Sequence, residues 1–165
     1  MPGPQDPLER FSEIEKLVSR VYFRFSHLFL NDPELRDFWW QMAKEEEEHS
    51  SILLACKALV DSHESAKVDP GIAQGKAERI EEQLNAYLGR GTASITVDEA
   101  FRIALDIEGS ELDAIYSRLV KSSELEIGKT MEHVGVPASV QRRKLAAAVR
   151  RFATDPEVRA SAEAL

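Results

Sequence analysis

Apolar residues recur at intervals of three and four along most of this chain, which is the spacing that places side chains on one face of an α-helix. The stripe is clearest between residues 8 and 30, and similar stripes follow further on. Its members are Phe11, Ile14, Val18, Val21, Tyr22, Phe25 and Leu28. No alternation of period two persists long enough to predict a strand. The pattern therefore predicts an all-α fold.

Capping signals separate the first two helices. Asp32 has the form of an N-cap residue, and Pro33 stands at the first helical position behind it. These residues predict a second helix over 33–63. Residues 66–95 hold several glycines around one short helical stripe, and they are expected to form a long connection that contains a short helix.

The second half of the chain is predicted to hold two more helical regions. Thr96 and Glu99 have the spacing of a capping box, and a helical region is expected over 97–134. A last helix is expected over 137–153, and the tail after 155–156 is expected to fray or to pack loosely. A chain of 165 residues suits one domain, so 1–165 is expected to fold as a single unit.

Composition limits the classes of function. The formal net charge of -8 argues against a broad nucleic-acid-binding surface. The start of the chain has no basic and apolar signal pattern, and no run of about 18 apolar residues predicts a membrane span. Cys56 is the only cysteine, which fits a reducing cytoplasm and is expected to act as a small buried apolar residue.

Several ionisable residues interrupt the apolar stripes. Glu15 lies on the first stripe, Glu46 and His49 lie on the second, and Glu108 lies on the third with Glu111 close to the same side. A charged side chain facing a core costs several kcal/mol unless it is paired, protonated or bound to a metal. Carboxylates with one imidazole suit iron or manganese, and zinc is a further option. The sequence therefore predicts a metal site in the interior between the helices.

Two alternatives apply to these residues. Residues 45–48 form a run of four glutamates, and such runs usually mark a solvated helix face. His133 is a further candidate ligand if the chain turns at 122–123, because it would then lie about level with Glu111. If the helix instead continues to Gly135, His133 is a favourable charge near a helix C-terminus.

The order of these motifs resembles the rubrerythrin branch of the ferritin-like superfamily. Glu15 and Tyr22 match a Glu-x6-Tyr pattern, Glu46 and His49 match Glu-x-x-His, and the third helical region carries two glutamates and a tyrosine. This resemblance implies a four-helix bundle with a long crossover. It also implies iron, Fe2+ or Fe3+, for peroxide or oxygen reduction or for Fe(II) oxidation. The implied iron ligands are Glu15, Glu46, His49, Glu108 and Glu111, with Tyr22 and Tyr116 hydrogen-bonded to ligand carboxylates.

The last helix departs from the family pattern, which there has a second Glu-x-x-His. Gln141 and Lys144 occupy the corresponding places in an ungapped register, and the lysine can neutralise carboxylates. This leaves one ion, or none, unless a second chain completes the site in a homodimer or higher oligomer. The resemblance without Cys-x-x-Cys pairs implies an external electron donor. The alternative is a non-catalytic bundle that acts in interaction or assembly through its basic last helix.

Overall fold

The computed structural model describes residues 5–62, 74–90, 95–110, 112–122 and 137–165. Within these ranges the chain forms seven helices and no strand, which confirms the predicted all-α class. The helices are α1 (Pro7–Leu28), α2 (Pro33–Ser62), α3 (Gln74–Gly89), α4 (Val97–Glu108), α5 (Leu112–Ser122), α7 (Ala138–Phe152) and α8 (Pro156–Glu163). None of the described helices has the length and apolarity of a membrane span.

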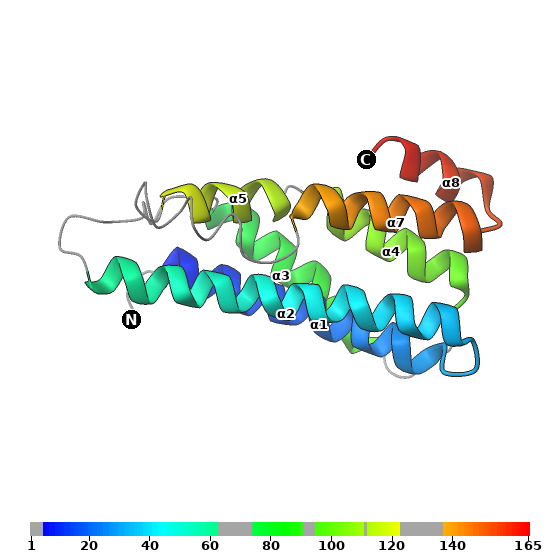
Figure 1. Ribbon diagram of the computed structural model, residues 1–165, viewed down its shortest axis with the longest axis horizontal. Coiled ribbons are helices and arrows are strands. Elements are labelled where there is room, and N and C mark those ends of the chain that lie inside the picture. Colours follow the sequence, from blue (N-terminus) through cyan, green and yellow to red (C-terminus); the bar gives the residue numbers. More distant parts are fainter. Residues whose placement is uncertain (1–4, 63–73, 91–94, 111, 123–136) are drawn as a thin grey trace.

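The two long helices α1 and α2 run antiparallel and form the most extensive helix pair (Figure 1). In the same view α5 and α7 follow one another above this pair, with α4 beside α7. The last helix, α8, turns back against α7 and α4. The interior between these helices is where polar side chains on the inner faces of α1 and α2 meet.

Small residues allow α1 and α2 to pack closely. Ser12, Ser19 and Ser26 recur every seven residues on α1, and all of them are buried. The Ser12 hydroxyl donates to the carbonyl of Ser50 at 3.0 Å, and that of Ser26 donates to the carbonyl of Arg36 at 2.9 Å. These bonds satisfy buried hydroxyls and fix the register of the two helices. The register in turn decides which polar residues of α1 and α2 face each other.

The structure differs from the sequence pattern at Gly109, where the predicted third helical region is divided. The amide of Gly109 donates to the carbonyl of Leu105 at 2.9 Å and ends α4, and α5 begins at Leu112. A Cβ atom on residue 109 would lie 3.0 Å from that carbonyl oxygen, which favours glycine here. The apolar spacing continues across this break, so periodicity alone did not reveal it.

The tail after 155–156, which was expected to fray or to pack loosely, instead forms a capped helix with a buried side. Asp155 caps α8 by accepting the amide of Glu157 at 2.9 Å, and Pro156 occupies the first turn. Val158 and Ala162 are then buried on one side of the helix. The tail is ordered because a capping aspartate, a proline and two apolar residues four apart suffice to dock a short helix.

Asp98, in the first turn of α4, connects this helix to the turn before α8. Its carboxylate accepts the amide and the hydroxyl of Thr154 at 2.8 Å and 2.7 Å, and the amide of Asp155 at 3.2 Å. These hydrogen bonds, the one from the Thr154 hydroxyl most of all, lower the pKa of Asp98 below its ordinary value of 3.8. The charged form of Asp98 thus holds two distant parts of the chain together.

We expect Asp98→Ala to lower the free energy of unfolding near neutral pH by about 1 kcal/mol, since the contact is partly exposed. A lowered pKa gives stability that is present above the unfolded-state pKa and is lost as the pH falls through the folded-state pKa. The difference between wild type and variant should therefore shrink at about pH 3. Urea unfolding at both pH values measures it. Glu163→Ala, on the exposed side of α8, is the control, and an equal loss there would contradict the role of Asp98.

Candidate metal centre

Three buried side chains from α1 and α2 converge inside the protein. Glu15, Glu46 and His49 each place a possible ligand atom so that all three atoms lie within 4.8 Å of one another. The residues are only 1%, 2% and 1% exposed. Glu46 and His49 share a helix face because they are three residues apart, and the antiparallel register brings Glu15 to them. This group can hold a metal ion, as the sequence pattern predicted.

The contacts within the group orient its donors. Nδ1 of His49 lies 3.2 Å from Oε2 of Glu46. The imidazole also packs against the ring of Tyr116 on α5, with ring centroids 4.6 Å apart and an interplanar angle of 33°. Burial, and next the negative charge of Glu15, raise the pKa of Tyr116 above its ordinary value of 10.0. The phenol therefore stays protonated and can donate a hydrogen bond.

Glu108 belongs to the same interior but not to the three-residue group. It is the last residue of α4, is 5% exposed, and accepts a hydrogen bond from the hydroxyl of Tyr22 at 2.6 Å. The resemblance implies that Tyr22 donates a hydrogen bond to a ligand carboxylate. In the structure the carboxylate that accepts it is that of Glu108. Two further candidate ligands, Glu111 and His133, lie outside the described residues.

The helix α7 contributes an amide to this interior. Gln141 is fully buried, and its Nε2 donates to Oε1 of Glu46 at 2.5 Å. Lys144, one turn later, forms an ion pair with Glu45. Gln141 and Lys144, the two residues that the ungapped register singled out on this helix, therefore do contact acidic residues of α2. The register did not identify Glu45 as the partner of Lys144.

The alternative that residues 45–48 form a solvated face holds for only half of the run, and the predicted inward position of Glu46 is confirmed. Glu45 and Glu46 are buried at 6% and 2% exposure, whereas Glu47 and Glu48 are partly exposed. The reason is that four consecutive helical residues point in four directions, and α7 covers two of them. The position of Glu46 on the apolar stripe indicated its burial from the sequence, whereas Glu45 lies off that stripe and pairs with Lys144 of α7.

The chemistry of the donors fits a cation. The two carboxylates repel each other and are poorly solvated in this buried place, and a positive charge would relieve both effects. Oε1 of Gln141 is also buried and has no hydrogen-bond partner among the described residues. Oxygen donors with one nitrogen suit iron or manganese better than a metal that prefers thiolates. The group is thus built from the right atoms for such an ion.

These features define an all-α protein with a buried carboxylate and histidine group that can hold a metal ion. Comparison of the chain with protein-family models, with curated proteins and with solved structures finds no match. The geometry of the buried group is therefore the basis for assigning a function.

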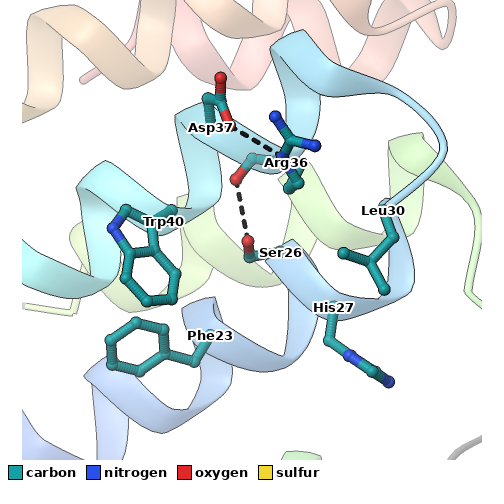
Figure 2. A pocket seen from close by; sticks show the side chains of 7 residues that line it. All are labelled: Phe23, Ser26, His27, Leu30, Arg36, Asp37 and Trp40. Atoms are coloured by element: carbon teal, nitrogen blue, oxygen red, sulfur yellow. Dashed lines mark hydrogen bonds and ion pairs between the residues drawn. The ribbon is translucent and has the colours of Figure 1, made fainter.

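A separate open hollow of about 480 Å³ lies near the turn between α1 and α2 (Figure 2). Phe23 and Trp40 meet edge-on at one side of it, with ring centroids 5.0 Å apart. Its one carboxylate, Asp37, is paired with Arg36 at 2.8 Å. The hollow shares no residue with the buried group, so we assign it no part in metal binding.

Proposed function

We propose that this protein binds a redox-active metal ion, most favourably iron, through Glu15, Glu46 and His49. The observation that carries the proposal is the convergence of three ligand atoms within 4.8 Å in a core where each side chain is almost fully buried. Two buried carboxylates beside an imidazole are stabilised by a positive charge, and a cation supplies it. Manganese and zinc are the other ions that this donor set accepts.

Glu108 is the residue that we propose to extend this donor set. It is buried, and Tyr22 donates to one of its oxygens, which orients the carboxylate as outer hydrogen bonds do at metal sites. We propose the same kind of role for Tyr116, whose ring packs on His49. Glu111 remains a proposed ligand on the strength of the sequence resemblance.

We further propose that the chain is a ferritin-like bundle of the rubrerythrin type. Support comes from the two motif-bearing helices, which form a long antiparallel pair, and from α3, a separate helix in the expected 66–95 connection. Iron held by carboxylates can supply peroxide or oxygen reduction, or Fe(II) oxidation. The chain's own part is to bind the ion, orient Glu108 through Tyr22 and shield the site from water. We propose an external electron donor, because Cys56 is the only cysteine.

Metal content tests the proposal. We expect the protein, produced in iron-supplemented medium and purified without chelator, to retain about one ion per chain by mass spectrometry of the metals. The double variant Glu46→Ala, His49→Ala should lose at least about nine-tenths of it, because two of three donors are gone. Glu47→Ala is a matched control, since this partly exposed carboxylate pairs with Lys44. Metal at background level in wild type would refute the proposal.

One observation favours a second function. The residues of α7 that approach the site are an amide and an ammonium group, and they engage Glu46 and Glu45 in place of a metal. A helical bundle that no longer binds a metal would show such contacts between protein side chains. It could act through exposed arginines of α7, which are Arg143, Arg150 and Arg151. This alternative predicts metal at background level in the same measurement.

A further inference from the structure

We infer that Gln141 limits the metal centre to one ion and positions Glu46 to bind it. This inference rests on the proposed function. The two oxygens of Glu46 have different neighbours: Oε2 lies 3.2 Å from Nδ1 of His49, and Oε1 accepts the amide of Gln141 at 2.5 Å. A carboxylate that bridges two ions uses both of its oxygens. In this chain the second oxygen is already occupied by a protein group.

The direction of the Gln141 amide follows from hydrogen-bond chemistry. An ionised carboxylate only accepts, so the NH2 group of the amide must face Glu46. Its carbonyl oxygen is then left in the interior, where it is buried and has no partner among the described residues. A lone buried acceptor is costly, and a water molecule held by the ion is the donor that suits this place. Gln141 therefore donates its amide nitrogen to the ligand Glu46, and its buried oxygen would be free to accept a hydrogen bond from a water molecule at the site.

The charges near the site point to the same number of ions. Within the three-residue group, Glu15 and Glu46 bring two negative charges, which one divalent cation balances. The nearby carboxylate of Glu108 already accepts a hydrogen bond from Tyr22. The neighbouring carboxylate, Glu45, is buried and paired with the ammonium group of Lys144. A second divalent ion would have to displace that ammonium group, and it would gain no charge from the neutral amide. The last helix thus replaces a second ion with side chains of the protein.

Titration with cobalt(II) under anaerobic conditions tests this inference, because the visible absorption of bound cobalt gives both the stoichiometry and the affinity. We expect wild type to saturate at about one ion per chain. The double variant Gln141→Glu, Lys144→His supplies an added carboxylate and an imidazole and should saturate at about two. Gln141→Ala should still bind one ion, with an affinity lower by about tenfold, as for other outer-shell losses. Gln41→Ala, an exposed glutamine on α2, is the matched control.

Each outcome distinguishes this inference from the proposed function. Two ions in wild type, or one ion in a double variant with the wild-type circular dichroism spectrum, would overturn the role of Gln141 and leave metal binding intact. If the double variant does not fold, an unchanged affinity in Gln141→Ala would overturn it instead. A wild-type chain that binds no cobalt would overturn the proposed function itself.

Discussion

Removal of the metal should lower the free energy of unfolding by about 3 kcal/mol or more. A ligand that binds only the folded state stabilises it by about 2.7 kcal/mol when its free concentration is about 100 times its Kd. The structure gives a cause for this effect, because the proposed ion would offset the buried charges of Glu15 and Glu46. Urea unfolding of chelator-treated protein, with and without added manganese(II), measures the difference.

The double variant Glu15→Gln, Glu46→Gln is the control for this prediction, since it keeps the side-chain shapes and removes the charges. We expect manganese to leave its stability unchanged. Without metal, the variant should be at least as stable as wild type, because neutral amides cost less to bury than two neighbouring carboxylates. A wild-type protein indifferent to metal, or a variant that responds equally, would show that the buried group is not stabilised by a cation.

Charged side chains weaken an apolar core, and this is why the buried group could be found from the sequence. Glu15, Glu46 and His49 break the apolar stripes of two helices, and a break that weakens the core indicates a function. The regular spacing of α1 and α2, together with Asp32 and Pro33 at the turn between them, fixed the relative positions of these residues. Local signals were sufficient here because both helices are long and strongly periodic.

The remaining features depend on contacts between distant parts of the chain. The buried Glu45 pairs with Lys144 on α7, and the sequence around Glu45 indicates only a charged helix. The end of α4 at Gly109 also escaped the periodic pattern, because apolar residues continue at helical spacing on both sides of it. Patterns within one helix cannot show which partner helix covers a given face.

Two adjacent tryptophans show the same dependence on packing and give the largest expected change in stability. Trp39 is fully buried among aromatic rings, whereas Trp40 is 51% exposed. The ring centroids of Phe25, Phe38 and Phe101 lie 4.9, 4.8 and 5.0 Å from that of Trp39. We expect Trp39→Ala to lower the free energy of unfolding by about 3–5 kcal/mol, because it leaves a large cavity in a close-packed core.

Trp40→Ala is the matched control for this measurement, since the same side chain is removed one residue away. Its loss should cost less than about 1 kcal/mol, because Trp40 is half-exposed and packs edge-on against Phe23 alone among the aromatic rings described. The ring of Tyr22 lies 5.6 Å from that of Trp39, and its hydroxyl donates to Glu108. Trp39→Ala should therefore also weaken metal retention by loosening Tyr22, whereas Trp40→Ala should not. Equal losses of stability in the two variants would contradict the burial on which this prediction rests.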